Sequence, residues 1–185
     1  MLNALKSFKF YLKYYLTNHV VNRVPFHAFR LGWYRRFMGI KIGGGSQIWL
    51  GCRFVGDTID QVEIGRNTVL ASDVMINASA FVHIGDHVNI AHEVCILTSV
   101  HDCQDPDFAP IKDGVTIRSQ AWIGTRAMIQ KGVTVGEGAV VAACAVVMHD
   151  VKPLAIVAGS PARQYGTRAA PSPPASKQDP PPLFC

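Results

Sequence analysis

An aliphatic residue recurs at every sixth position through much of this chain. The clearest run consists of Ile117, Ile123, Ile129, Val135, Val141 and Val147. A second series, four residues after each of these, has small side chains: Ala121, Ala127, Val133, Ala139, Ala145 and Val151. A period of six matches neither the helical repeat of 3.6 nor the alternation of a half-buried strand, so amphipathic helices and hairpin sheets are both excluded for this region.

The same period extends back to Ile42 and predicts a stack of coils. Short repeats must stack, because one repeat cannot bury its apolar face alone. Three steps make one coil, and strands of successive coils should lie about 4.8 Å apart in parallel ladders. We therefore expect an all-β fold, a triangular prism of parallel β-strands with the aliphatic residues inside. The coils should start near Ile42, Ile64, Ile84, Ile117 and Val135.

With 185 residues, 49% of them hydrophobic, the chain should form one domain with extensions. Five cysteines without a CxxC pair favour a reducing compartment over a disulfide framework or a zinc site. No apolar run is long enough to span a bilayer, and the start does not resemble a secretory signal, which predicts a cytoplasmic protein. We divide the chain into a basic aromatic segment (1–40, helix plus linker), the prism (41–152, with an inserted loop at 102–116), a closing segment (153–168) and a flexible Pro-rich tail (169–185).

Charge is segregated along the sequence. Residues 1–56 contain nine Lys or Arg and no Asp or Glu, and they are rich in aromatic rings. Leu5, Phe8, Leu12 and Tyr15 have helical spacing. One interpretation is a helix and a strand-like linker that cover the open ladder edge of the prism. The alternative is a peripheral contact of residues 1–37 with anionic lipid at the inner face of the membrane. Nucleic acid is not favoured, because no known binding motif accompanies the basic residues.

The repeat is interrupted once, after Ile96. The next coil should begin at about residue 102, yet it begins at Ile117, so about fifteen residues are inserted. Loops of this length are usually functional. His101 stands at the root of the insertion and is followed by Asp102. If the loop folds over His101, one of the seven histidines of the chain lies in a sheltered cleft, where it can act as a general base.

Four motifs resemble the sugar O-acetyltransferases of the hexapeptide-repeat family, especially those of polysaccharide biosynthesis. They span residues 97–108, 121–127, 132–143 and 156–163. The resemblance implies a left-handed parallel β-helix, a homotrimer, acetyl-CoA as co-substrate in a groove between subunits, and a saccharide acceptor. It also implies that His101 is the general base. Asp102 either holds the imidazole tautomer or only turns the loop.

The same resemblance assigns the remaining site residues. Backbone groups at Gly124, Thr125, Ala142 and Ala143 would contact coenzyme A, and Arg163 would meet its phosphates. His149 stands where the family more often has lysine and is a further candidate at that end of the cofactor. We expect the ring of Trp122 to be exposed, where it would form a wall at the acceptor or thioester end of the site. The repeat alone also explains many of these positions, because it requires small residues there whether or not a cofactor binds.

The sequence leaves several alternatives open for the acceptor and for the activity itself. Alanine at position 71 replaces an asparagine of the maltose and galactoside branch, which argues against a free maltose-like acceptor and favours a polysaccharide or a lipid-linked saccharide. A non-sugar acceptor, such as a xenobiotic or an amino acid, is the main alternative. A γ-type carbonic anhydrase would need two histidines in neighbouring steps, but His92 is followed by Leu97, so we predict no metal. A non-catalytic scaffold is the third alternative.

Overall fold

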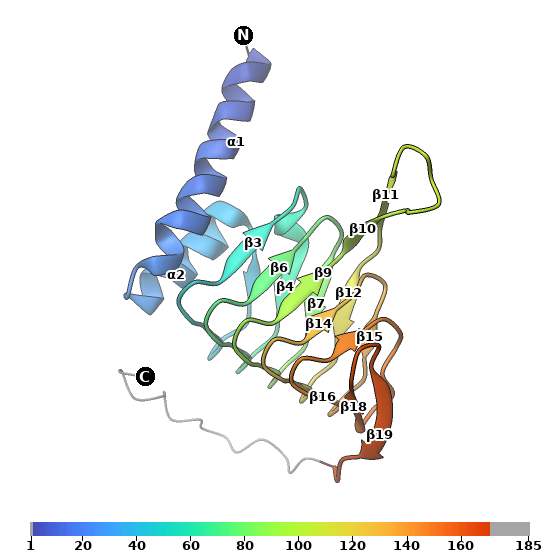
Figure 1. Ribbon diagram of the computed structural model, residues 1–185. Coiled ribbons are helices and arrows are strands. Elements are labelled where there is room, and N and C mark those ends of the chain that lie inside the picture. Colours follow the sequence, from blue (N-terminus) through green and yellow to red (C-terminus); the bar gives the residue numbers. More distant parts are fainter. Residues whose placement is uncertain (1, 171–185) are drawn as a thin grey trace.

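The computed structural model describes residues 2–170, with side chains from residue 10 onward. The chain forms a parallel β-helix of triangular cross-section, with helices at one end and a hairpin that projects from one corner (Figure 1). The all-β parallel β-helix predicted from the period of six is therefore confirmed. Most of the predicted Pro-rich tail, 169–185, lies outside the described residues.

Three sheets form the faces of the prism, and each takes one strand from every coil. Sheet A contains β1 (Lys41–Ile42), β4 (Val62–Ile64), β7 (Val82–Ile84), β12 (Val115–Ile117) and β15 (Thr134–Val135). Sheet B contains β2 (Gln47–Ile48), β5 (Val69–Leu70), β8 (Asn89–Ile90), β13 (Trp122–Ile123), β16 (Val140–Val141), β18 (Ala155–Ala158) and β19 (Arg163–Thr167). Sheet C contains β3 (Arg53–Val55), β6 (Met75–Asn77), β9 (Cys95–Leu97), β14 (Met128–Ile129) and β17 (Val146–Val147).

The ladder register confirms the predicted coil starts. In sheet A, Ile42 pairs with Ile64, Ile64 with Ile84, and Ile84 with Ile117. Ile117 pairs in turn with Val135. Ile84 and Ile117 are neighbours although the insertion separates them in sequence, so the inserted residues leave the stack in register.

The interior contains both series of the repeat. Aliphatic residues of the first series, such as Ile84, Ile123 and Val141, are fully buried. Small residues of the second series lie beside them, and Ala127 is also fully buried. Cys52 occupies a second-series position in the first coil, where burial raises the pKa of its thiol to about 12. This alternation of large and small side chains fills the narrow triangle at the density expected of a protein core.

The N-terminal segment is helical almost to the first coil. It contains α1 (Leu2–His19), the short helix η1 (Val21–Arg23), α2 (His27–Trp33) and a π-helical turn η2 (Tyr34–Met38). The predicted strand-like linker is wrong, because rings spaced by four residues, Phe29, Trp33 and Phe37, pack along one continuous helical surface. Gly39 ends this helix in the left-handed region, with φ of 76°, before β1 begins.

Side chains of this segment close the open ladder edge of the first coil. On β3, the Asn18 amide donates to Phe54 O and accepts from Phe54 N, each at 2.9 Å. On β2, Arg30 Nη2 donates to Ile48 O at 2.8 Å. Each bond satisfies a backbone group that has no strand beside it. The predicted covering of the ladder edge by the N-terminal segment is therefore confirmed.

His27 completes the closure of β2. Its Nε2 accepts the Ile48 N–H at 3.3 Å, which requires an unprotonated nitrogen. Burial, together with the charges of Arg30 and Arg35, lowers the pKa of His27 and keeps the ring neutral. Because this pKa is depressed in the folded state, the contribution of His27 to stability is present above its unfolded pKa and is lost as the pH falls through the folded value.

The apolar residues of α1 at helical spacing are not the residues that contact the prism. Leu12 and Tyr15 are exposed, whereas Thr17 and Asn18 are buried. A ladder edge presents backbone donors and acceptors, so a helix that covers it needs polar side chains at the contact rather than an apolar stripe. Leu5 and Phe8 belong to the part of α1 whose side chains the structure does not describe.

The inserted residues form an antiparallel hairpin of β10 (Ser99–His101) and β11 (Pro110–Lys112). A short helix, η3 (Ile59–Gln61), precedes β4 in the second coil. No helix within residues 2–170 combines the length and the apolar composition needed to cross a bilayer.

We predict that Asn18→Ala destabilises the protein by about 2 to 4 kcal/mol, because it leaves one buried N–H and one buried C=O of Phe54 without partners. Chemical denaturation at matched protein concentration measures the change. Gln61→Ala removes an exposed amide of η3 and should stay within about 0.5 kcal/mol of the wild type. Equal losses for the two variants would contradict the role of Asn18.

Candidate functional site

His101 ends strand β10 at the root of the hairpin. Its Nδ1 lies 2.5 Å from the carbonyl oxygen of Phe108, on the far side of the hairpin turn. A carbonyl oxygen can only accept, so Nδ1 carries the proton in this contact. In the neutral ring, Nε2 is then left with its lone pair. A histidine held in this tautomer can accept a proton at Nε2, which is the property required of a general base.

The hairpin does not fold over His101. Ser99, Val100 and His101 pair with Lys112, Ile111 and Pro110, and this ladder carries the turn away from the prism (Figure 1). His101 is exposed as a result, and so are Phe108 and Ile111. The predicted cleft formed by the loop of the same chain is therefore wrong, because the insertion has paired strands of its own. Within residues 2–170, no segment of the chain shelters His101.

Asp102 makes its contacts within the hairpin turn. Its carboxylate accepts a hydrogen bond from the Gln104 backbone N–H at 2.9 Å, and its own N–H donates to Ala109 O at 3.0 Å. The ring of His101 bonds Phe108 instead. Of the two roles predicted for Asp102, this geometry favours the turning of the loop.

The candidate cofactor residues lie on a different corner of the prism. Gly124 and Thr125 form the turn from sheet B to sheet C in one coil, and Ala142 and Ala143 form the same turn in the next. We call this the small-residue corner. A Cβ added to Gly124 would lie 2.5 Å from Ala143 N, so the stacking of coils by itself requires glycine there. Contact of these residues with a cofactor stays a prediction.

His101 belongs to the opposite edge of sheet C, where the chain turns toward sheet A. We call this edge the hairpin corner, and it also contains the exposed His149, two coils further on. Trp122 lies on the outer face of sheet B, with 54% of its surface exposed. Within one chain, the width of sheet C therefore separates His101 from the small-residue corner, and the predicted residues do not share one cleft.

Arg163 begins β19, the antiparallel strand after the closing turn. Its side chain is exposed and donates only to the neighbouring Ala162 O, at 3.0 Å, among the contacts described for residues 2–170. The turn that precedes it packs beside β17, since Val146 N donates to Gly159 O and Ala162 N donates to Val146 O. A guanidinium held at this end of the prism has its donors available for an anion.

Two features of the site were not predicted. The Phe108 carbonyl that orients His101 is a backbone group, and no side-chain pattern in the sequence indicates it. The second is an ion pair between Lys112 of β11 and Asp57 of the first coil, 2.9 Å long, which ties the base of the hairpin to the prism. Their separation by 55 residues gives no local sequence signal.

Among the residues that the structure describes, no three His, Cys, Asp or Glu side chains are grouped closely enough to hold a metal ion. His92 is exposed at the turn between sheets B and C, and its ring lies 6.1 Å from that of Trp49. Leu97 lies at the position where the carbonic anhydrase pattern would need a second histidine.

Comparison with known proteins gives one family-model match, to the bacterial transferase hexapeptide (six repeats), over residues 114–149. A chloramphenicol acetyltransferase of Escherichia coli is 32% identical over 118 residues, covering 60% of this chain and 54% of the relative. A galactoside O-acetyltransferase of Escherichia coli K12 is 32% identical over 105 residues, covering 55% and 52%. The chain thus spans about half the length of these curated relatives.

A solved structure is similar over most of the chain. It is a hexapeptide-repeat acetyltransferase of Vibrio cholerae O1 biovar eltor in complex with acetyl coenzyme A, with 27% identity and a TM-score of 0.76. The similarity covers 85% of this chain and 86% of that one. The predicted resemblance to hexapeptide-repeat acetyltransferases is therefore confirmed in both repeats and fold.

Proposed function

We propose that this protein is an O-acetyltransferase that moves an acetyl group from acetyl-CoA to a hydroxyl of a saccharide in polysaccharide biosynthesis. The observation that carries the proposal is the fixed tautomer of His101, with Nδ1 bonded to Phe108 O and Nε2 free as a base. The acetyl-CoA complex of the similar Vibrio cholerae enzyme supports the choice of co-substrate.

In the proposed reaction, His101 Nε2 takes the proton from the acceptor hydroxyl as that oxygen attacks the acetyl carbonyl carbon. The carbon–sulfur bond of the thioester then breaks, and the imidazolium returns the proton to the departing thiolate. The Phe108 carbonyl stabilises the imidazolium while it holds the proton. Backbone groups of Gly124, Thr125, Ala142 and Ala143 would hold the carrier arm. Arg163, with His149, would meet its phosphates.

The acceptor class rests on the sugar-acetylating relatives and on Ala71. This residue follows β5 at the turn from sheet B to sheet C, is 9% exposed and offers no side-chain hydrogen bond, which disfavours a maltose-like acceptor held as in the galactoside branch. Trp122, exposed on sheet B, is the candidate wall of the acceptor end. The similarity to a chloramphenicol acetyltransferase keeps a xenobiotic acceptor as the second candidate. Competing panels of sugars and hydroxylated xenobiotics distinguish the two.

We predict that His101→Ala lowers kcat by about 10² to 10⁴ while the protein remains folded, because only the proton-transfer group is removed. Thioester consumption with a sugar panel measures the rate, and circular dichroism verifies the fold. His83→Ala, which removes an exposed histidine from the outer face of sheet A, should retain full activity. A fully active His101→Ala would refute the proposed base.

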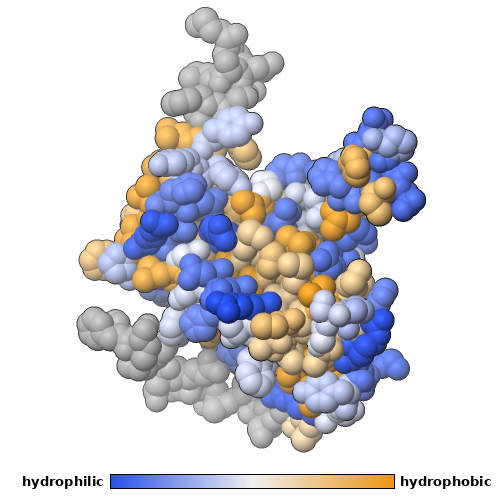
Figure 2. Space-filling model, in the orientation of Figure 1, coloured by the Kyte–Doolittle hydropathy of each residue, from blue (hydrophilic) through white to orange (hydrophobic). Residues whose placement is uncertain are grey.

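We further propose that the protein assembles as a homotrimer. The outer face of sheet A is polar, with Lys41, Glu63 and His83 in one row. The outer row of sheet C is mainly apolar and contains Met75, Cys95, Met128 and Val146. Figure 2 shows hydrophobic residues gathered over these front strands.

A hairpin of two strands is marginally stable by itself, so the projecting β10–β11 unit also favours a partner surface. Contact between two different faces of neighbouring subunits closes into a ring when the rotation between them is cyclic. Such a ring would bring the hairpin corner of one subunit beside another subunit and shelter His101. This arrangement would cover His101, which the described part of a single chain leaves exposed.

We predict that Met128→Glu yields monomers without acetyltransferase activity, because it places a charge in the proposed apolar interface. Thr116→Glu, on the outer face of sheet A, should leave the trimer intact. Sedimentation velocity and thioester consumption on the same samples test both. Fully active wild-type monomers would contradict this site model.

The N-terminal helices are our candidate for a peripheral membrane contact at the inner face of the membrane. Several rings there are exposed, among them Tyr11 (68%), Phe26 (73%) and Phe29 (52%). Figure 2 shows hydrophobic side chains along the outer edge of α1 and α2. Residues 1–56 have nine basic and no acidic side chains, so an anionic lipid surface complements their charge.

We predict that the protein co-sediments with phosphatidylglycerol vesicles at low salt, does so less at 0.5 M salt because charge is screened, and does not bind phosphatidylcholine. Phe29→Ser with Phe37→Ser should weaken binding several-fold. Tyr165→Ser removes a still more exposed ring from β19 and should have no effect. The lipid proposal fails if wild-type protein stays in the supernatant at low salt.

A further inference from the structure

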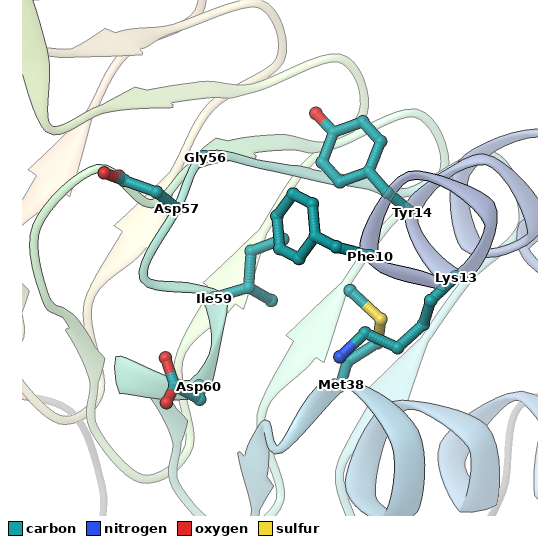
Figure 3. Close-up of a pocket in the computed structure, with 8 residues that line it drawn as sticks. All are labelled: Phe10, Lys13, Tyr14, Met38, Gly56, Asp57, Ile59 and Asp60. Atoms are coloured by element: carbon teal, nitrogen blue, oxygen red, sulfur yellow. The ribbon is translucent and has the colours of Figure 1, made fainter. Parts of the chain in front are cut away.

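A cleft of about 190 Å³ separates α1 from the first coil (Figure 3). One wall comes from the N-terminal helices and the other from the turn between β3 and β4. The lining residues are Phe10, Lys13, Tyr14, Met38, Gly56, Asp57, Ile59 and Asp60. No residue predicted for the acetyl-transfer site lies among them, so the cleft has no role in the chemistry proposed above.

The cleft combines aromatic faces with charged groups. The rings of Phe10 and Tyr14 are stacked, with centroids 6.3 Å apart. Asp57 and Asp60 come from the opposite wall, and in Figure 3 their exposed carboxylates point away from the two rings, while the Lys13 ammonium lies on the helical wall. The Asp57 carboxylate accepts a hydrogen bond from Lys112 at 2.9 Å. Apolar ring faces pack against C–H surfaces, an ammonium donates hydrogen bonds to hydroxyl oxygens, and the exposed Asp60 carboxylate can accept them from hydroxyls outside the ring-lined part of the cleft. A sugar ring offers all three partners.

The size of the cleft limits what it can hold. Pockets for complete small-molecule ligands usually measure roughly 300 to 1,000 Å³. A cleft of about 190 Å³ is smaller and suits a single ring. It would therefore hold one unit of a longer molecule whose other units lie elsewhere.

The cleft lies on the hairpin corner, the same corner as His101. In sheet C, Val55 pairs with Asn77 and Asn77 with Leu97, so the turn after β3 is two coils from the root of the hairpin. Two strand spacings amount to about 10 Å along the prism. The ion pair of Asp57 with Lys112 joins the cleft wall to β11 directly.

We propose that this cleft is a remote subsite that binds one sugar ring of an oligosaccharide acceptor while a hydroxyl of another ring lies at His101. The inference rests on the proposed acetyl transfer and adds a length requirement to it. An acceptor that fills both positions gains binding energy that a monosaccharide cannot obtain. The enzyme should then prefer glycan chains to single sugars.

The test uses soluble gluco-oligosaccharides and N-acetylglucosamine oligomers of one to four units with the full-length protein and acetyl-CoA. Of the two oligosaccharide series, we consider the one that the wild type acetylates better. In that series, kcat/KM for the tetramer should exceed kcat/KM for the single sugar by about tenfold or more, which corresponds to about 1.4 kcal/mol. Phe10→Ala and Asp60→Asn should each bring this ratio close to one. The loss should appear as a higher KM for the tetramer. Tyr15→Ala, an exposed ring on the same helix that does not line the cleft, should preserve the ratio.

Two results would overturn the inference or its premise separately. If oligomers are acetylated but both cleft variants keep the wild-type length ratio, the subsite is refuted and the acetyl transfer stands. If no member of the panel is acetylated, the acetyl transfer to sugars is contradicted. The cleft is then tested alone by saturation-transfer NMR with the tetramers: binding lost in Phe10→Ala supports the subsite, and binding retained there, or absent from the wild type, refutes it.

Discussion

Hydrogen bonds between successive coils hold the prism together. Strands of the prism such as β2, β5 and β8 have only two residues each, which is too short to be stable without the ladder above and below. A ladder of this kind leaves an unpaired edge at each end. At the C-terminal end the antiparallel pair β18–β19 turns back on sheet B. At the N-terminal end, Asn18 and Arg30 replace the missing strand with side chains.

The same hydrogen bonds determine where the chain can change without loss of the fold. The hairpin is inserted at a corner, between two strands rather than within one, so Ile84 and Ile117 stay paired. The insertion can therefore carry chemistry that the repeat itself cannot. Its backbone supplies the Phe108 carbonyl that fixes the His101 tautomer, and its base is tied back to the first coil through Lys112.

The sequence predicted the repeating part of the structure almost completely, because every coil applies the same rule of one aliphatic and one small residue. It failed where that rule does not act. The apolar spacing of Leu12 and Tyr15 suggested a buried helix face, but a ladder edge selects the polar Asn18 instead. The hairpin was expected to cover His101, yet its own strand pairing turns it outward. The first effect is not visible in local sequence, because Asn18 and Phe54 are 36 residues apart. The second comes from two strands of only three residues each, which is too short for a clear pattern.

The separation of the two candidate corners follows from the prism and has a functional consequence. His101 and the cleft beside α1 lie on the hairpin corner, whereas Gly124 and Ala143 lie across sheet C on the small-residue corner. Under the proposed function, a single chain would then have an acceptor side and a carrier side that do not meet. In the proposed ring of three subunits, one corner of each chain would face the other corner of its neighbour, and the two sides would meet three times. Assembly would then be a condition of catalysis, since proton transfer by His101 requires both the hydroxyl and the thioester within reach of the same nitrogen.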